Sequence, residues 1–310
     1  TISFRQLAQG IKSVASGLVS RGFAKGDVLA IYSPNTPTYP IAFHGVAHAG
    51  GVVTTVNPTY LVSDLAGQLR DSGARFIITA GPFTDNACKA AEEVGGIDEI
   101  FSFDGSSGTT AFSELMETGE PYSGVSINLN QDLLTLPYSS GTTGISKGVM
   151  LSHRNLVANM AQLDGCEELC RPLTERDTLI AVLPFFHIYG LTVIMNYALS
   201  KGASIVVLPR FDLEQFLATI QEYGVTFAHL VPPILVALAK HPLVDAYDLT
   251  SLEGITSGAA PLGKELAEAV EARLGCVVSQ GYGLTETSPV THMAPNRERG
   301  QTPHASVGPV

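Results

Sequence analysis

The chain has 310 residues, and 45% of them are hydrophobic, which is enough for one large or two ordinary domains with buried cores. Its 18 Lys and Arg residues against 29 Asp and Glu residues give a net charge of −11. That balance argues against a general nucleic-acid binder, because such a protein needs a basic face, so the expected partners are small molecules. The four cysteines show no spacing that suits zinc. They indicate reduced thiols and predict a cytoplasmic location, with the peroxisome as the alternative.

The first predicted element is an amphipathic helix that closes near Gly22. Ser3 and Gln6 form a capping-box pattern, and apolar residues follow at helical spacing. No charged segment with an apolar run after it is visible at the start, so no signal peptide is expected. Because a native chain rarely opens on a ready-made cap, we expect further residues before Thr1.

Further along, short apolar runs alternate with segments of helical periodicity. The runs cover residues 28–32, 52–56, 76–79, 100–103, 179–183, 204–208, 225–231 and 254–256. One helical segment begins after Asp212 as its cap, and another is entered through Pro261 and runs to Leu274. Alternating strands and helices predict βαβ units and an α/β fold with mostly parallel sheets.

Residues 178–200 contain no Asp, Glu, Lys or Arg and are numerous enough to span a bilayer. Pro184, His187 and Gly190 interrupt this segment midway. We therefore expect a buried strand, a turn and a buried helix rather than a membrane span.

The segment YSSGTTGISKGVMLSH, residues 138–153, brings glycines, hydroxyls and a lysine into one loop. The glycines give the backbone unusual freedom, which lets several N–H groups converge on an anion. The hydroxyls add donors, and Lys147 adds a point charge that suits phosphate. We interpret the loop as a cradle for phosphate oxygens, with the candidate residues Ser139, Ser140, Gly141, Thr142, Thr143, Gly144 and Lys147.

Two other motifs fit this loop poorly. A Walker phosphate loop fails at two positions, where Ser146 replaces the required Gly and Gly148 replaces Ser or Thr. Residues 144–148 match the G-x-S-x-G pattern of a serine hydrolase, which needs its Ser on a strand-to-helix turn. Here residues 149–151 predict a strand, and the helix is expected only after Ser152 as its N-cap.

Two later segments offer groups for the rest of a nucleotide. Gly258, Ala259 and Ala260 follow an apolar run and let something flat lie against the backbone, although close packing of strand on helix explains them equally well. Tyr282 is expected on a glycine-flanked turn, where it can stack on a base, and Glu286 can hold Mg²⁺. The ordinary alternatives are a core Tyr and a solvated Glu.

Together these segments resemble one enzyme family. LPYSSGTTGISKGVMLSHRNL is similar to the AMP-binding signature of the adenylate-forming acyl-CoA synthetases, which include 4-coumarate–CoA ligases and firefly luciferase. GYGLTE is similar to the family's later nucleotide motif, and PFFHIYG, VPPI and YDLTSLEGITSGAAPLGKEL fit the same order. The resemblance spans essentially the whole chain and is greatest to 4-coumarate–CoA ligases.

The resemblance implies the large N-terminal domain of such an enzyme, built as two stacked αβα subdomains. Residues 1–165 would carry the phosphate loop, and residues 166–310 would carry the adenine and acyl pockets, with the helix over residues 1–22 free to pack on the second subdomain. The family's ribose-binding Asp, its hinge and the C-terminal domain with the adenylation Lys would lie beyond Val310. We therefore expect residues 1–310 alone to bind nucleotide weakly and not to turn over.

The resemblance also implies roles for the candidate residues, of which Lys147, His187 and Thr285 would be catalytic. The loop residues and Lys147 would hold the β- and γ-phosphates, and Thr285 would touch the α-phosphate. Glu286 would bind the metal, and His187 would border the acyl carboxylate and gate passage toward the thiol. The nucleotide would also contact Gly258, Ala259, Ala260, Gln280, Gly281, Tyr282 and Gly283. The acyl pocket would be lined by His187, Tyr189, Val193, Gly281, Pro289 and Val290.

The implied reaction uses ATP, Mg²⁺ and coenzyme A and has two steps. A carboxylate attacks the α-phosphorus of ATP and releases pyrophosphate, and the CoA thiol then displaces AMP from the acyl-adenylate. The mixed aromatic and aliphatic lining suits a hydroxycinnamate or a medium- or long-chain fatty acid. An adenylation domain that loads a carrier protein or a reductase, luciferin oxidation, and a non-catalytic nucleotide-binding fragment are the alternatives.

One departure from the family signature concerns the phosphate loop itself. Ile145-Ser146 stands where the signature usually has Leu-Pro. Because Pro would fix one φ angle, its absence predicts a less rigid loop.

Overall fold

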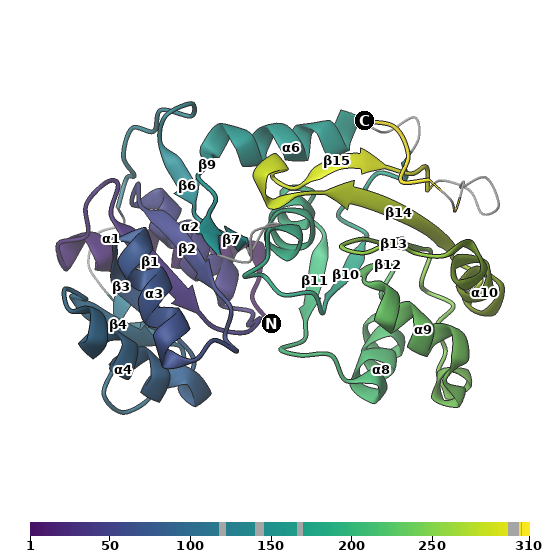
Figure 1. Cartoon of the computed structure of the whole chain (residues 1–310), viewed down its shortest axis with the longest axis horizontal. Coiled ribbons are helices and arrows are strands. Elements are labelled where there is room, and N and C mark those ends of the chain that lie inside the picture. The colour runs from purple at the N-terminus through teal and green to yellow at the C-terminus, as the bar shows by residue number, and fades with distance from the viewer. Residues whose placement is uncertain (118–121, 140–145, 166–169, 297–303, 305) are drawn as a thin grey trace. The chain divides into compact units, whose positions relative to one another are not determined.

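The computed structural model describes residues 1–117, 122–139, 146–165, 170–296, 304 and 306–310. The chain divides into two compact units, Thr1–Arg154 and Asn155–Val310 (Figure 1). This boundary comes earlier than the expected one after residue 165. Helix α6 (His153–Gly165) belongs mostly to the second unit, where the buried side chain of its Asn159 bonds the backbone of Val290.

The N-terminal unit alternates strands and helices, as the sequence predicts. Its elements are α1 (Phe4–Ser20), β1 (Val28–Tyr32), α2 (Tyr39–His48), β2 (Val52–Val56), α3 (Val62–Ser72), β3 (Ala74–Thr79), η1 (Gly81–Phe83), α4 (Thr84–Val94), β4 (Glu99–Ser102), β5 (Thr110–Ala111), α5 (Phe112–Met116), β6 (Leu133–Thr135), β7 (Tyr138–Ser139), β8 (Lys147–Gly148) and β9 (Leu151–Ser152). The main sheet has the order β5-β4-β3-β1-β2-β6-β9. Its pairs are parallel except for β6 with β9.

Both faces of this sheet are buried. Ala30 and Tyr32 of β1 join a core cluster with Leu65 of α3 and with residues of α4. Because side chains alternate along a strand, Leu29 and Ile31 point to the opposite face, where α2 contacts β1 and β2. The predicted αβα layering of this unit follows from these two sets of contacts (Figure 1).

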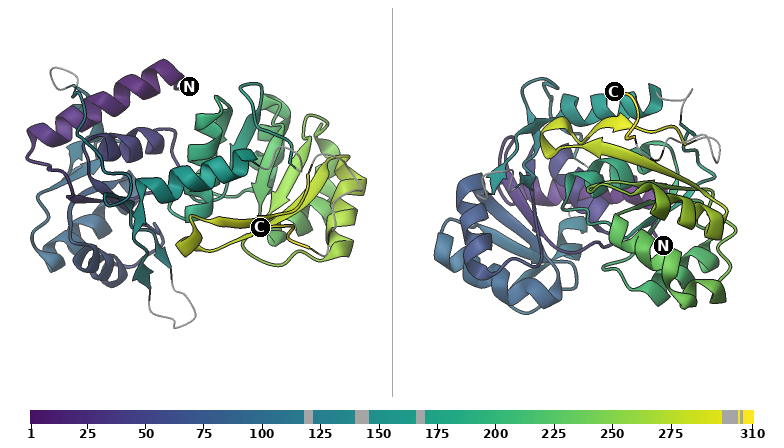
Figure 2. Two further views of the ribbon diagram at one scale, coloured as in Figure 1. Left: turned by 90° about the horizontal axis from the view of Figure 1, so that it is seen from above. Right: turned by 45° about the vertical axis from the view of Figure 1, so that its right-hand side comes forward.

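Helix α1 begins at the predicted capping box. The Ser3 amide donates to Gln6 Oε1 at 2.8 Å, and the Gln6 amide donates to Ser3 Oγ at 3.3 Å. The helix packs on α2 and α5 within the N-terminal unit (Figure 2). A Cβ on Gly45 would lie 2.5 Å from Val14, so the close approach of α1 and α2 requires a glycine there.

The C-terminal unit contains a second, mostly parallel sheet of order β11-β10-β12-β13-β14-β15, with only the β14–β15 pair antiparallel among its described strands. Its elements are β10 (Thr178–Ala181), η2 (Gly190–Tyr197), α7 (Ala198–Ser200), β11 (Ser204–Val207), α8 (Leu213–Tyr223), β12 (Phe227–Leu230), α9 (Pro232–Lys240), η3 (Pro242–Ala246), β13 (Gly254–Ser257), α10 (Lys264–Leu274), β14 (Val277–Gly283), η4 (Thr285–Thr287) and β15 (Val290–Met293).

The apolar segment over residues 178–200 folds as a buried strand, a turn and a buried helix, as predicted. The helix differs in its winding, because η2 is a π-helix, a form that often marks functional sites. Among the described residues, no helix combines the length and the apolar character that crossing a membrane requires.

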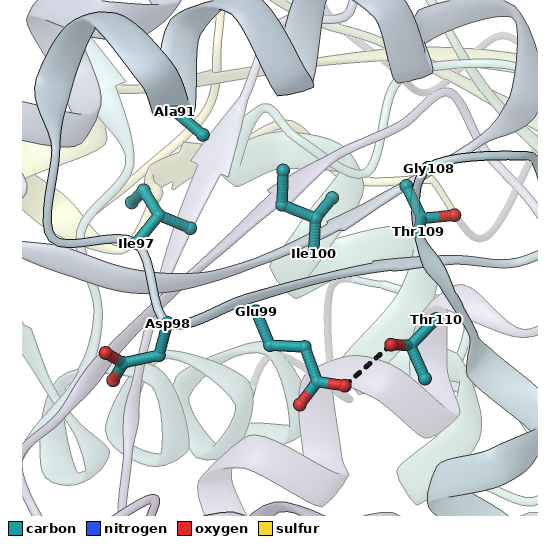
Figure 3. A pocket seen from close by; sticks show the side chains of 8 residues that line it. All are labelled: Ala91, Ile97, Asp98, Glu99, Ile100, Gly108, Thr109 and Thr110. Atoms are coloured by element: carbon teal, nitrogen blue, oxygen red, sulfur yellow. Dashed lines mark hydrogen bonds between the residues drawn. The ribbon is translucent and has the colours of Figure 1, made fainter.

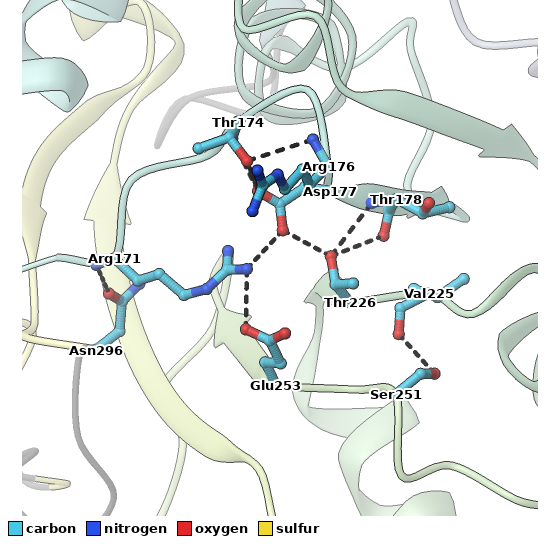
Figure 4. A network of polar contacts seen from close by, with 10 residues as sticks. All are labelled: Arg171, Thr174, Arg176, Asp177, Thr178, Val225, Thr226, Ser251, Glu253 and Asn296. Carbon is cyan, nitrogen blue, oxygen red and sulfur yellow. Dashed lines mark hydrogen bonds and ion pairs between the residues drawn. The ribbon is translucent and has the colours of Figure 1, made fainter.

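A polar network joins the amino ends of neighbouring strands in this second sheet (Figure 4). Asp177, directly before β10, accepts hydrogen bonds from Arg171 at 2.6 Å and from Thr226, directly before β12, at 2.8 Å. Arg171 also pairs with Glu253, directly before β13, at 2.9 Å. Burial alone would raise the pKa of Asp177, but the hydrogen bonds from Arg171, Thr174 and Thr226 outweigh burial and lower it.

Candidate functional site

The predicted phosphate loop is held at its base by a short antiparallel ladder. Ser139 of β7 lies opposite Lys147 of β8, and Tyr138 lies opposite Gly148. This ladder confirms the strand-loop-strand arrangement, and α6 begins at His153 as predicted. The G-x-S-x-G match therefore has no helix after its Ser and is not a hydrolase elbow.

The side chain of Tyr138 links the ladder to helix α3. Its hydroxyl donates to Asp71 Oδ2, at the end of α3, at 2.5 Å. Burial, together with the neighbouring carboxylate, raises the pKa of this phenol. The ring also packs on Gly148, where a Cβ would lie only 3.0 Å from it, so the glycine lets the hairpin close.

Lys147 is exposed on this hairpin and forms no ion pair with any residue that the structure describes. Its ammonium is therefore available to an anion. The other predicted loop residues, Ser140, Gly141, Thr142, Thr143 and Gly144, lie outside the described residues.

In the C-terminal unit, segments far apart in the sequence gather at one edge of the sheet. Strands β10, β12, β13 and β14 run parallel, so their carboxyl ends share that edge. The segments that leave it are 182–190, 231–234, 258–263 and 284–289, and they carry the PFFHIYG, VPPI, SGAAP and LTE motifs. The carboxyl edge of a parallel sheet is where ligands bind in open α/β folds.

The segment directly after β13 has almost no side chains, because it consists of Gly258, Ala259 and Ala260. Gly258 is buried and donates its N–H to the carbonyl of Leu230 at 3.1 Å, whereas both alanines are exposed. Ala259 has a φ of 66°, a left-handed conformation that costs an alanine about 1 kcal/mol. This strained, exposed backbone suits a flat ligand.

The sequence-based start of the next helix is wrong. Helix α10 begins at Lys264 with Gly263 as its N-cap, so Pro261 does not open it. Leu262 instead lies buried in the loop, where its N–H donates to the side chain of Gln280 at 3.1 Å. Gly263 after it has an extended backbone, with φ −69° and ψ 145°, so helical geometry starts only at Lys264.

Tyr282 does not lie on a turn, as the sequence suggested, but in strand β14 opposite His292 of β15. The two rings meet edge to face with centroids 5.9 Å apart, and Tyr282 is 49% exposed. Its neighbour Gly281 lies in the same strand. At Gly283 a Cβ would come within 2.1 Å of the Pro289 carbonyl, so only glycine fits the strand end. Tyr282 is thus an exposed aromatic on a rigid element.

Gln280, a predicted nucleotide contact, uses its side chain inside the fold. Its amide group accepts from Leu262 and donates to the carbonyl of His304 at 2.6 Å. Any contact of Gln280 with a nucleotide would therefore come from its main chain.

Thr285 and Glu286 lie on η4, in the tight loop between β14 and β15. The loop is closed by the Leu284 N–H, which donates to the Pro289 carbonyl at 3.0 Å. Glu286 is exposed and forms no ion pair with the described part of the chain. A single free carboxylate fits Mg²⁺, which is often held by one or two carboxylates together with water and substrate phosphates. The described residues contain no cluster of three or more potential metal ligands of the His, Cys, Asp or Glu type.

His187 and Tyr189 follow β10 on the way into η2. His187 Nδ1 accepts from the N–H of Tyr189 at 3.3 Å. The His187 side chain is exposed at the surface, yet surrounding protein atoms displace enough water to lower the pKa of its imidazole. His187 is therefore largely neutral near pH 7.

The predicted acyl-pocket residues Tyr189, Val193 and Val290 belong to one apolar cluster. Val193 is only 2% exposed and forms part of the core, whereas Tyr189 and Val290 are partly buried against it. Pro289 is buried directly before Val290. Two residues that the sequence did not point to support this cluster. Asn159 bonds both the N–H and the carbonyl of Val290, and His229 of β12 contacts the hydroxyl of Tyr189.

The AMP-binding enzyme family model matches residues 1–310, which is the whole chain. The chain belongs to the AMP-binding enzyme family. 4-Coumarate–CoA ligase 1 of Petroselinum crispum is 40% identical over 294 residues, which are 94% of this chain and 54% of that protein. The chain therefore spans about half the length of the curated relatives it matches.

Solved structures of the family share the fold. A long-chain-fatty-acid–CoA ligase from Archaeoglobus fulgidus superposes with a TM-score of 0.85 at 28% identity, over 94% of this chain and 59% of that one. The ATP-bound MatB from Rhodopseudomonas palustris gives a TM-score of 0.84 at 27% identity, over 99% of this chain and 58% of that one. The predicted α/β class with mostly parallel sheets is confirmed.

A separate hollow of about 460 Å³ lies in the N-terminal unit (Figure 3). It is lined by Ala91, Ile97, Asp98, Glu99, Ile100, Gly108, Thr109 and Thr110. Its carboxylates already have partners, because Asp98 pairs with Arg75 at 2.5 Å and Glu99 accepts from Thr110 at 2.6 Å. It includes no residue of the family motifs, so it is not a candidate site.

Proposed function

We propose that this chain is the nucleotide- and acid-binding part of an AMP-forming acid–CoA ligase. In the first step, a carboxylate oxygen of the acid would bond to the α-phosphorus of ATP while the bond to pyrophosphate breaks. In the second step, the thiol of coenzyme A would bond to the acyl carbon and AMP would leave. The acid most consistent with the relatives is a hydroxycinnamate, with a fatty acid as the alternative.

The observation that carries this proposal is the gathering of four family motifs at the carboxyl edge of one parallel sheet. Gly258 to Ala260 would face the flat adenine, and the exposed ring of Tyr282 would stack on it. Thr285 would contact the α-phosphate. Tyr189 and Val290 would border the acyl group, since both are partly buried in one apolar cluster. The acid and the adenine would thus be recognised by loops of a single sheet.

Charge is the main obstacle in the first step, because an anionic carboxylate must approach a polyanion. The hairpin would offset this repulsion with the ammonium of Lys147 and the N–H groups of the loop after Ser139. Bound Mg²⁺ would neutralise phosphate charge, and Glu286 would help to hold it. His187, largely neutral near pH 7, would leave the acid's negative charge free to attack.

The test is pyrophosphate release by the whole protein with ATP and a series of hydroxycinnamates, benzoates and fatty acids of increasing length. We expect release to be fastest with a hydroxycinnamate and to be followed by CoA thioester formation. Release without a thioester would favour loading of a carrier protein or a reductase. No release with any acid would rule out the ligase.

A further inference from the structure

The hydroxyl of Tyr189 is held from behind by two neighbouring strands. It lies 3.0 Å from His229 Nδ1 on β12 and 3.3 Å from the carbonyl oxygen of Thr256 on β13. His229 and Thr256 are direct partners in the parallel register of these strands. The two groups that meet the phenol therefore have positions fixed by the sheet.

The protons at this junction can be assigned from the partners. The Thr256 carbonyl can only accept, so both contacts are hydrogen bonds at once only if the single phenol proton of Tyr189 is donated to this carbonyl. The phenol oxygen then accepts from His229, which requires the tautomer with the proton on Nδ1. His229 is 4% exposed, and burial lowers its pKa to about 3, so the imidazole is neutral at any physiological pH. Both hydrogen bonds are then satisfied without a buried charge.

The ring of Tyr189 is clamped as well as its hydroxyl. The His229 ring meets it edge to face with centroids 5.6 Å apart. On another side the ring packs on Gly258, where a Cβ would lie 2.8 Å from the ring carbon Cε1. Tyr189 therefore touches the proposed adenine wall while it borders the proposed acyl pocket.

We infer that His229 is a positioning residue that fixes the rotamer of Tyr189 and thereby sets which acids the pocket of the proposed ligase accepts. The inference rests on the function proposed above. With the phenol pinned to the sheet, the ring cannot turn away from Gly258, and the pocket keeps one width. A flat acid gains from this rigidity, because no side-chain freedom is lost when it binds.

Loss of the imidazole would leave the Tyr189 oxygen without its donor and allow the ring to swing. For His229→Leu we expect the KM for a hydroxycinnamate to rise by about 3- to 10-fold with kcat within about twofold, because ground-state and transition-state binding are weakened alike. The preference for flat over bulky acids should fall by a similar factor. KM for ATP should change less than KM for the acid, because Tyr189 meets the proposed adenine wall only through Gly258.

The variants to compare in the whole protein are His229→Leu, His229→Asn, Tyr189→Phe and the double variant His229→Leu with Tyr189→Phe. An Asn amide can donate from near the position of Nδ1, so His229→Asn should restore KM at least in part. Tyr189→Phe should match His229→Leu, and the double variant should be no worse than either single one. Phe216→Leu is the matched control, since this fully buried ring on α8 is not one of the residues described in the Tyr189 cluster.

Two results would overturn the inference: additive effects in the double variant, or an equal rise of KM in Phe216→Leu. A separate readout does not depend on activity. The ¹⁵N NMR spectrum of His229 in this chain should show the Nδ1–H tautomer and no protonation down to pH 5, and an Nε2–H tautomer or a pKa near 6 would contradict it. If no acid supports pyrophosphate release but the tautomer is as stated, the ligase proposal fails while the clamp on Tyr189 stands.

Discussion

The phosphate hairpin and the carboxyl edge of the second sheet present ligand-binding groups in opposite ways. The hairpin offers Lys147 from a ladder of two residue pairs, and the side chain reaches solvent without support. At the carboxyl edge, Tyr189 and Val290 are held by buried polar groups of His229 and Asn159. A flexible charge suffices to neutralise phosphate, whereas shape recognition of an acid needs fixed walls. Substitutions in the two regions should therefore separate activity from stability.

The largest expected effect comes from a substitution in the hairpin, which should lower activity without changing stability. Lys147→Ala should lower pyrophosphate release by about 10²- to 10³-fold, because the positive charge that offsets phosphate repulsion in the transition state is lost. The melting temperature should stay within about 1 °C of the parent, since the side chain is exposed and unpaired with described residues. Lys12→Ala, an exposed lysine on α1, is the control and should change neither quantity. An unchanged rate in Lys147→Ala would place the phosphates elsewhere.

A substitution at the amino edge of the second sheet should have the opposite result, with stability lowered and binding of the acid unchanged. Asp177→Ala should lower the free energy of unfolding by about 3 kcal/mol, because it removes a buried carboxylate that bonds Arg171 and Thr226. Since Glu253 still pairs with Arg171, the loss should be at the lower end of the range for broken buried pairs. Urea denaturation measures the change, and the KM for the acid should not move. A raised KM would show that the two edges are coupled.

The carboxylate of Asp177 also determines how the stability of the protein changes with pH. The folded-state pKa of Asp177 is lowered, so its contribution to stability is fully present above the unfolded value near 4. That contribution is lost as pH falls through the lower folded-state pKa. Between pH 7 and pH 2, Asp177→Asn should therefore lose less stability than the parent does.

Gly258→Ala should lower both activity and stability, each by less than the substitutions above. The new Cβ would push on the Tyr189 ring, whose hydroxyl is bonded to the sheet and cannot yield freely. We expect about 1–3 kcal/mol of destabilisation together with a raised KM for the acid. Gly263→Ala is the matched control in the same loop, because its nearest neighbouring atom lies 3.8 Å away and its φ is negative. Equal losses in both variants would attribute the effect to the loop rather than to Tyr189.

Most of the fold could be predicted from local sequence patterns. The strand Val28–Tyr32 begins and ends where its apolar run does, because a strand buried on both faces reads as continuous hydrophobic sequence. The strand Val52–Val56 includes two threonines, but all five of its residues are β-branched and so favour a strand. The caps at Ser3 and Asp212 were also readable, since a cap bonds an amide three residues away. These features depend on near neighbours only.

The sequence-based predictions failed where the local structure depends on residues far away in the chain. Pro261 does not open α10, because the extended backbone of Gly263 separates the two while Leu262 is buried in the loop beside Gln280 of β14. Tyr282 reads as a turn residue between glycines, but pairing with His292 extends β14 through it. The contact of Asn159 with Val290 was also missed, because the two residues are 131 positions apart in the chain.

The sequence by itself determined the family, the alternation of strands and helices and the motifs that carry the proposed chemistry, because these are encoded in local spacing. Only the tertiary structure decided how those motifs are supported. His229 is a lone imidazole in an apolar strand, and its partner Tyr189 precedes it by 40 residues. Their contact exists because parallel pairing sets β12 between β10 and β13. Strand order is a property of the whole sheet, so no local pattern could have revealed that contact.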